Sequence, residues 1–270
     1  MPYVSNGKSI GLVPTMGALH QGHLSLVERC RAENDVVVVS IFVNPTQFNN
    51  QEDLSNYPRN LSADLTILQA IHSESLVVYA PSYEDLYEQG LQTRQFDFGG
   101  LELEMEGKFR PGHFDGVGTI VGKLFEIVRP ARAYFGEKDY QQLLIIKELV
   151  RQLEIPTQII PCPIYREEDG LAMSSRNERL NASERRAAPL IYKVLQSVKS
   201  KFGTENVLEV MKWVEFQFAE EPLLNLEYFT IADAETLKPI VNINKNRTYR
   251  AFIAAFAGNV RLIDNIALNN

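Results

Sequence analysis

Short apolar runs alternate along the first half of the chain with segments of helical spacing. The runs predict β-strands at residues 9–13, 36–43, 76–79, 131–135 and 158–161. The second run opens with four consecutive valines, and a β-branched run without polar alternation is typical of a central strand buried on both faces. Strands that alternate with helices in this way form a parallel sheet covered by helices, so the pattern predicts an α/β fold.

The pattern changes after the fifth run. Helical stretches come first and strand-like runs follow, at residues 183–202, 207–218, 226–231, 251–257 and 261–267. Gly258 and Asn259 separate the last two runs and readily adopt the positive φ of a tight hairpin turn. We therefore predict two domains, residues 1–162 and a smaller α+β domain of residues 163–270, joined at the proline-stiffened segment around Cys162.

Composition narrows the class of protein. The 270 residues are 45% hydrophobic and 23% charged, which is typical of a globular protein with a sizeable core. The formal net charge of −7 argues against a surface that binds nucleic acid, and it restricts phosphate-bearing ligands to places where cations are concentrated. No apolar stretch reaches the ~18 residues that span a bilayer, and the N-terminus lacks the apolar core of a signal peptide. The two cysteines show neither a disulfide framework nor the spacing of metal ligands. We expect a soluble, unprocessed cytoplasmic protein with no nucleic-acid or membrane partner.

The segment that ends at His23 follows a predicted strand and leads into a predicted helix at residues 22–34. Gly17 and Gly22 allow the backbone to approach a ligand closely, and free N–H groups at the start of a helix favour an anion. His20 and His23 can both point toward phosphates there, and a protonated imidazole offsets charge that develops on phosphorus. Two alternatives stay open from the residues alone: surface histidines beside an ordinary turn, or part of a zinc site that lacks a recognisable third ligand.

The segment Gly136-Glu137-Lys138-Asp139 lies at the end of a predicted strand and the start of a helix, where ligands gather in open parallel sheets. Lys138 is a compact cation suited to a phosphate at that helix end. Taken alone, the segment is more often a solvated cluster in which Asp139 caps the helix.

Hydroxyl groups and a guanidinium gather in the segment Met173-Ser174-Ser175-Arg176, just past the predicted domain junction. These groups can hold triphosphate oxygens, and a loop between domains can close over a ligand. Taken alone, the segment is simply a turn, and its weight as a ligand site comes from its co-occurrence with the histidine and lysine motifs in one chain.

Two side-chain amides follow the buried valine strand. Asn44 and Gln47 can donate and accept hydrogen bonds at once, so they suit a small substrate with hydroxyl and carboxylate groups. The alternative is a turn formed by Asn44 and Pro45.

The glycines between Gly116 and Gly122, followed by Lys123, resemble a phosphate loop only at first glance. The spacing is one residue too long, and Leu124 stands where that loop needs a hydroxyl. We expect these glycines to permit close packing of a helix, and we expect Cys30, which lies among helical apolar positions, to be a core residue.

Taken together, these motifs are specific, and the chain resembles the pantothenate synthetase family, also called the pantoate–β-alanine ligases. The resemblance covers nearly the whole chain. The segments that carry it are Pro14-Thr15-Met16-Gly17, His20-Gln21-Gly22-His23, Phe42-Val43-Asn44-Pro45-Thr46-Gln47-Phe48, Tyr57-Pro58-Arg59, Arg110-Pro111-Gly112-His113-Phe114, Gly136-Glu137-Lys138-Asp139, Asp169-Gly170-Leu171-Ala172-Met173-Ser174-Ser175-Arg176-Asn177 and Arg261-Leu262-Ile263-Asp264-Asn265.

The resemblance implies a Rossmann-like first domain that binds ATP and pantoate, of the adenylyl-transferring superfamily with the His-x-Gly-His signature, and a second domain that acts as a lid. It implies a reaction in two steps. The pantoate carboxylate attacks the α-phosphorus of ATP to give pantoyl adenylate and pyrophosphate, and the β-alanine amine then attacks the acyl carbon to give pantothenate and AMP. Mg²⁺ is implied because the triphosphate must be neutralised before a carboxylate can approach it. A homodimer built through the first domains is implied as well.

The resemblance also implies roles for individual residues. His23 takes the position that the family treats as the general acid, and His20 lies beside it on the phosphates. The catalytic residues implied are His20, His23, Lys138, Ser174, Ser175 and Arg176. The ATP-binding residues implied are Met16, Gly17, Ala18, Leu19, His20, Gln21, Gly22, His23, Gly136, Glu137, Lys138, Asp139, Tyr165, Met173, Ser174, Ser175 and Arg176.

Gln47 and Gln142 are implied to hold pantoate and β-alanine, with Asn44 close behind them. Asp64 lies where a carboxylate could approach the metal, but no direct metal ligand and no covalent nucleophile is assigned. Relatives usually have a further strand and helix before the strand that ends at Val13, whereas a dozen residues precede Val13 here. This difference leaves open the edge of the sheet and the completeness of the chain.

Two other functions are compatible with the motifs. A nucleotidylyltransferase would move AMP or CMP onto a phosphate ester and stop there. A regulator on the same fold would bind ATP without turnover, because a fold alone does not decide function.

Overall fold

We describe a computed structural model of the chain over residues 7–71, 74–87, 90 and 92–269. The chain divides into two compact units, unit 1 (Met1–Pro163) and unit 2 (Ile164–Asn270). No helix in the described ranges combines the length and the apolar character that crossing a membrane requires.

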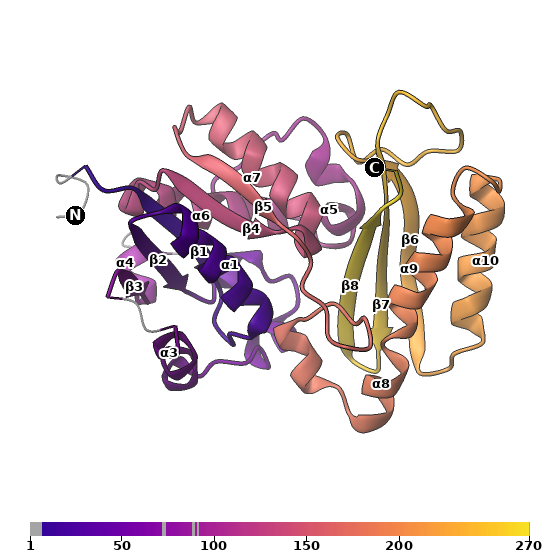
Figure 1. Cartoon of the computed structure of the whole chain (residues 1–270), viewed down its shortest axis with the longest axis horizontal. Helices are drawn as coiled ribbons and strands as arrows, with labels where there is room; N and C mark the ends of the chain where they lie inside the picture. The colour runs from indigo at the N-terminus through magenta and orange to yellow at the C-terminus, as the bar shows by residue number, and fades with distance from the viewer. Residues whose placement is uncertain (1–6, 72–73, 88–89, 91, 270) are drawn as a thin grey trace. The chain divides into compact units, whose positions relative to one another are not determined.

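Unit 1 is built on a five-stranded parallel sheet in the order β3-β2-β1-β4-β5 (Figure 1). The strands are β1 (Ile10–Thr15), β2 (Val36–Ile41), β3 (Leu76–Tyr79), β4 (Arg132–Gly136) and β5 (Gln158–Cys162). The chain adds β2 and β3 on one side of β1 and then places β4 and β5 on the other side. The order therefore reverses between β1 and β4, and ligands of such sheets bind at the carboxyl ends of the strands at this point.

The five strands predicted for this sheet are present, and every strand end lies within two residues of its predicted position. The valine strand is central, as expected, because β2 pairs with both β1 and β3. Val36 and Val38 pack into one hydrophobic cluster, and Val37 and Val39 pack into the other. Both faces of the strand are thus covered, which explains why its sequence shows no polar alternation.

Helices cover the sheet of unit 1 and connect its strands: α1 (Gln21–Glu33), α2 (Gln51–Ser55), α3 (Leu61–Gln69), α4 (Tyr83–Leu86), α5 (Met105–Phe109), α6 (His113–Val128) and α7 (Tyr140–Gln152). Short 3₁₀ turns are η2 (Pro45–Gln47), η3 (Leu101–Leu103) and η4 (Glu137–Asp139). A side chain at Gly116 in α6 would come within 2.5 Å of the Thr46 carbonyl oxygen in η2, and one at Gly118 would crowd the rings of Phe96 and Phe98. Close packing of α6 is therefore confirmed for these two glycines, and Cys30 is fully buried in the core as predicted.

Unit 2 is an antiparallel three-stranded sheet in the order β6-β7-β8, with β6 (Leu224–Asp233), β7 (Tyr249–Ala257) and β8 (Val260–Ala267). The helices α9 (Leu190–Lys201) and α10 (Val207–Ala219) contribute to one hydrophobic core with β6, β7 and β8 (Figure 1). Gly258 supplies the positive φ of the β7–β8 turn, at 54°. The α/β fold with a small C-terminal α+β part is confirmed.

One predicted helix is wrong in its extent. The stretch at residues 183–202 is divided into α8 (Ala182–Ala187) and α9, with Pro189 at the start of α9. Proline lacks the N–H that a continuous helix needs and its ring clashes with the preceding turn, so the apolar spacing continues across a break in the backbone. The 3₁₀ turn η5 (Ser175–Arg179) precedes α8.

Candidate active site

The loop between β1 and α1 begins at the carboxyl end of the central strand. The Thr15 hydroxyl donates to the Ser40 carbonyl of β2 at 2.7 Å and accepts the Gly17 N–H at 3.2 Å. Gly17 has φ 78° and Ala18 has φ 49°, so two successive residues adopt the left-handed region. A non-glycine residue holds this conformation only when its surroundings compensate for the strain.

The compensation comes from Asp64 in α3, whose side chain is buried. One carboxylate oxygen accepts the Leu19 N–H at 2.7 Å, and the other accepts the Ala18 N–H at 3.2 Å. A side chain at Gly17 would come within 2.9 Å of the same carboxylate, which leaves glycine as the residue that fits. Asp64, considered in the sequence as a group near a metal, therefore holds the loop that carries the histidines.

The rings of His20 and His23 lie close together at the start of α1, with their planes tilted by 35°. Their ring centroids are 4.1 Å apart, and neither residue is fully exposed. The His20 backbone N–H donates to Nδ1 of His23 at 3.3 Å, so Nδ1 is an acceptor and the neutral ring carries its proton on Nε2. Burial, followed by the positive character of His20 and of Lys138, lowers the pKa of His23 to about 3. His23 is thus a neutral hydrogen-bond donor at ordinary pH.

Lys138 lies in η4, immediately after β4. Its side chain is 18% exposed, and its Nζ is 3.9 Å from the Asp139 carboxylate, which is 49% exposed. Because β1 and β4 are paired neighbours, the loops after them lie side by side, and the influence of Lys138 on the His23 pKa reflects this proximity. The sheet thus brings together two motifs that are more than a hundred residues apart in the chain.

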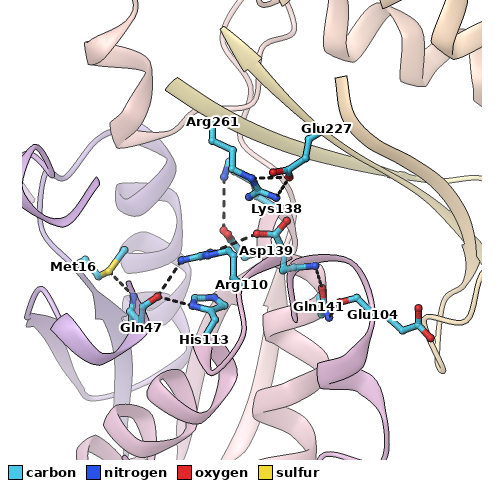
Figure 2. Close-up of polar contacts among 11 residues, drawn as sticks. Met16, Gln47, Glu104, Arg110, His113, Lys138, Asp139, Gln141, Glu227 and Arg261 are labelled. Atoms are coloured by element: carbon cyan, nitrogen blue, oxygen red, sulfur yellow. Dashed lines mark hydrogen bonds and ion pairs between the residues drawn. The ribbon is translucent and has the colours of Figure 1, made fainter. Parts of the chain in front are cut away.

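Gln47 ends η2, at the carboxyl end of the neighbouring strand β2. Its side-chain amide nitrogen is 2.6 Å from the sulfur of Met16, which belongs to the β1–α1 loop. Its backbone oxygen accepts two side-chain hydrogen bonds, from Arg110 Nη2 at 3.1 Å and from His113 Nδ1 at 2.8 Å (Figure 2). The segment Arg110-Pro111-Gly112-His113-Phe114 therefore fixes the backbone on which Gln47 stands.

Asn44 lies behind Gln47 and is 1% exposed. Its amide nitrogen donates to the Gly116 carbonyl at 3.1 Å, and its oxygen accepts from the Tyr87 hydroxyl at 2.7 Å and from the Thr46 hydroxyl at 3.1 Å. Asn44 therefore docks the end of β2 onto α6 through contacts within the protein. Its predicted contact with substrate stays a prediction.

Gln141 and Gln142 lie in the first turn of α7 and differ in burial. Gln141 is buried, donates to the carbonyls of Leu101 and Glu104 at 2.7 and 2.8 Å, and accepts the Glu106 N–H at 3.0 Å. Gln142, the predicted substrate residue, is partly exposed. The sequence motifs pointed to Gln142 and gave no sign that its neighbour fastens the segment before α5.

The Met173-Ser174-Ser175-Arg176 segment belongs to unit 2. The Ser174 hydroxyl accepts the Arg176 N–H at 3.3 Å and thereby caps η5, while Ser175 is buried. The Tyr165 carbonyl accepts the Met173 N–H at 3.0 Å, and the Tyr165 residue is 42% exposed. Within unit 2, Tyr165 and the four-residue segment are thus neighbours.

The described residues offer no group of three His, Cys, Asp or Glu side chains arranged to hold a metal ion. The zinc alternative for His20 and His23 therefore gains no third ligand in the described ranges.

A model of the pantoate-beta-alanine ligase family matches residues 2–267 of the chain.

The chain belongs to the pantoate–β-alanine ligase family. It is 56% identical over 267 residues to a pantothenate synthetase of Flavobacterium psychrophilum, covering 99% of this chain and 94% of that protein. A pantothenate synthetase of Bacteroides fragilis is 53% identical over 262 residues, which are 97% of this chain and 92% of the relative. The prediction of a ligase that joins pantoate to β-alanine is confirmed at the level of the family.

Solved structures of pantoate–β-alanine ligases share the fold. Pantothenate synthetase from Thermus thermophilus matches with a TM-score of 0.90 and 43% identity, over 97% of this chain and 94% of that one. Pantoate–β-alanine ligase from Francisella tularensis, complexed with beta-gamma ATP and β-alanine, matches with a TM-score of 0.80 and 39% identity, over 98% of this chain and 91% of that one. The predicted Rossmann-like architecture is therefore that of this ligase family.

Proposed function

We propose that this chain catalyses the ATP-dependent condensation of pantoate with β-alanine, through a pantoyl-adenylate intermediate, with release of pyrophosphate and AMP. The observation that carries the proposal is that the His23 loop follows β1 and Lys138 follows β4, the two paired strands between which the strand order of the sheet reverses. A Francisella tularensis relative was solved with an ATP form and β-alanine, which supports the same substrates here.

In the first step, ATP lies against the loop of residues 16–23 and against residues 136–139. The N–H groups at the start of α1 favour phosphate oxygens, and Lys138 supplies a positive charge beside them. His23 donates its Nε2–H to the nucleotide, with His20 next to it. Since the ligand-free protein keeps His23 neutral, a general-acid role requires the bound phosphates to raise its pKa.

Ser174, Ser175 and Arg176 are proposed to hold the triphosphate from unit 2, with Met173 and the backbone of Tyr165 near the nucleotide. Unit 1 in this proposal is the ATP- and pantoate-binding domain and unit 2 is the lid. Two hydroxyls and a guanidinium match phosphate oxygens in both charge and hydrogen-bonding geometry.

Pantoate is proposed to lie against Gln47 and Gln142, with Asn44 supporting Gln47 from behind. The contact between the Gln47 amide and the Met16 sulfur supports this proposal, because in-line attack on the α-phosphorus requires the pantoate carboxylate to lie beside the loop that is proposed to bind ATP. In the second step the β-alanine amine attacks the acyl carbon of the adenylate and AMP leaves. No side chain needs to form a covalent intermediate, because positioning and charge neutralisation can accelerate both steps.

Mg²⁺ enters this proposal as part of the nucleotide substrate. The described side chains form no three-ligand metal group, and Asp64 accepts backbone N–H groups with both of its oxygens. The ion would be held by triphosphate oxygens, where it neutralises charge before the carboxylate approaches. No residue of this chain is assigned to it.

A homodimer and a cytoplasmic location extend the same proposal. Sedimentation at twice the chain mass of 30.6 kDa would support the dimer. Two buried free thiols, Cys30 and Cys162, are compatible with a reducing compartment.

Exchange of labelled pyrophosphate into ATP tests the function. Purified protein with ATP, Mg²⁺ and pantoate must show pantoate-dependent exchange, and its absence would refute the ligase. Addition of β-alanine then separates the ligase, which releases AMP, from a nucleotidylyltransferase, which accumulates a stable dinucleotide. Calorimetric ATP binding without turnover of any carboxylate would instead indicate a regulator.

A further inference from the structure

The segment of residues 173–176 emerges directly from a short turn, residues 165–173, which we call the Arg166 turn. Arg166 and Ala172 form an isolated antiparallel bridge across it, and the Tyr165 carbonyl accepts the Met173 N–H at 3.0 Å. Gly170 closes the turn with φ 92°. The position of the two serines therefore depends on how this turn is attached to the rest of unit 2.

Arg166 makes that attachment. Its Nη1 is 2.6 Å from Asp264 Oδ2 and its Nη2 is 3.0 Å from Asp264 Oδ1, a bidentate ion pair with a residue of β8. The guanidinium also donates to the Gly170 carbonyl at 3.1 Å and lies 3.7 Å above the ring of Tyr192 in α9. One side chain thus joins the two arms of the turn to the sheet and to a helix of unit 2.

Because this ion pair is buried, a substitution that changes its hydrogen-bonding geometry is poorly compensated by water. The side chain of Asp264 is 2% exposed and that of Arg166 is 17% exposed, so solvent screens the pair only weakly. A planar guanidinium can satisfy two carboxylate oxygens and stack on a ring at once, whereas a lysine ammonium is a compact point charge that does not present this planar fork. A side chain at Gly170 would clash with the same Tyr192 ring.

A second arginine supports the outer side of the turn. Arg185 in α8 pairs with Glu167 at 2.5 Å and with Asp169 at 2.6 Å, and its side chain is 31% exposed. Exposed pairs contribute less because water screens them. Arg166 is therefore the more buried of the two anchors of the turn.

We propose that Arg166, paired with Asp264, is a positioning residue for adenylate formation. The pair holds the Arg166 turn so that Ser174, Ser175 and Arg176 are arranged for the triphosphate before ATP arrives. This inference rests on the proposed contact of those residues with ATP. It also gives a role to the Arg261-Leu262-Ile263-Asp264-Asn265 segment, in which Asp264 receives the guanidinium.

Loss of the anchor would leave the segment to be ordered by ATP itself at each binding event. The apparent affinity for ATP is then the intrinsic affinity multiplied by the fraction of molecules whose segment is correctly placed, so it falls as that fraction falls. Pantoate binding, assigned to unit 1, does not depend on that fraction. The second half-reaction starts from pantoyl adenylate and needs no contact with the β- and γ-phosphates.

The test uses Arg166→Lys, Asp264→Asn and the double variant of the full chain. We expect the ATP KM in pantoate-dependent pyrophosphate exchange to rise about tenfold or more, with the pantoate KM within about twofold of wild type. The rate of pantothenate formation at saturating synthetic pantoyl adenylate and β-alanine should stay within about twofold of wild type. The ATP KM of the double variant should be no higher than that of the more affected single variant, because the two residues act as one unit.

Arg247→Lys is the matched control, because Arg247 and Asp233 form another ion pair of unit 2 at 2.9 Å. Its ATP KM should not change. The proposal is overturned by an unchanged ATP KM in Arg166→Lys, by equal losses in both half-reactions, by the same effect in the control, or by loss of the folded circular dichroism spectrum. Arg176→Ala separates the proposed ATP contact of the segment from the positioning role of Arg166. A normal ATP KM in Arg176→Ala would overturn the ATP contact and the positioning role with it. A raised ATP KM in Arg176→Ala together with a normal ATP KM in Arg166→Lys would overturn only the positioning role.

Discussion

Replacing Asp64 with asparagine tests the most constrained part of the site. In the native protein the carboxylate accepts the N–H groups of Ala18 and Leu19, and it does so while buried. Asparagine has nearly the same shape but offers one acceptor oxygen, and its NH₂ group would face the other N–H. The substitution therefore removes the charge, breaks one hydrogen bond and leaves a buried donor without an acceptor.

The magnitude follows from these changes. A hydrogen bond to a charged group contributes about 1.5–3 kcal/mol, and a buried donor left unsatisfied costs about 1–3 kcal/mol. The left-handed conformation of Ala18, at φ 49°, adds strain of about 1–2 kcal/mol that the carboxylate offsets. If the substitution disfavours the binding-competent conformation of the loop by about 2 kcal/mol before ATP binds, the ATP KM rises about 30-fold.

The assay is pantoate-dependent pyrophosphate exchange, with ATP and Mg²⁺ varied independently. Asp97→Asn is the control, because Asp97 is an exposed aspartate that accepts a single backbone N–H, that of Gly99 at 2.9 Å. An ATP KM within about threefold of wild type would refute the reasoning, since ~0.6 kcal/mol is far below the expected loss. Recovery of activity at high Mg²⁺ would also refute it, because it would identify Asp64 as a metal ligand rather than an anchor of the loop.

Three further predictions concern the residues around this loop. Lys138→Ala should lower the rate of adenylate formation at least about tenfold, a loss of ~1.4 kcal/mol in transition-state stabilisation, and near-normal exchange would contradict its phosphate role. Gln47→Ala should raise the pantoate KM more than the ATP KM, and equal changes would disprove the substrate contact. Because the pKa of His23 lies at about 3 when folded, its NMR ring signals should not titrate between about pH 5 and 8 in the ligand-free protein, and a midpoint near 6.5 would contradict the burial argument. The unfolded chain takes up this proton below about pH 6.5 while the folded chain does not, so the contribution of His23 should lower the free energy of unfolding as the pH falls from 6.5 toward 3.

The sequence by itself determined the architecture and predicted the place of the site. Apolar runs without alternation can be buried only between two covering layers, which identified the valine strand as central. Glycine, histidine and lysine motifs at strand ends predicted where ligands gather, because the carboxyl ends of parallel strands share one edge. These conclusions depend on local order along the chain, which the sequence displays directly.

Other features required the tertiary structure. Pro189 divides an apolar pattern that runs on across two helices, and spacing alone does not reveal which prolines fall inside a helix. The low pKa of His23 arises first from burial and then from His20 and Lys138, and the attachment of the Arg166 turn depends on a carboxylate 98 positions away.

The same is true of the groups that hold Gln47 and the histidine loop. Arg110 and His113 donate to a backbone oxygen of residue 47, and Asp64 accepts backbone N–H groups of residues 18 and 19. A side chain that binds backbone leaves no pairing pattern in the sequence, because every residue type offers the same N–H and C=O groups. The sequence could thus show which residues are suited to the chemistry, but the burial and the contacts that orient them arise only when distant segments pack together.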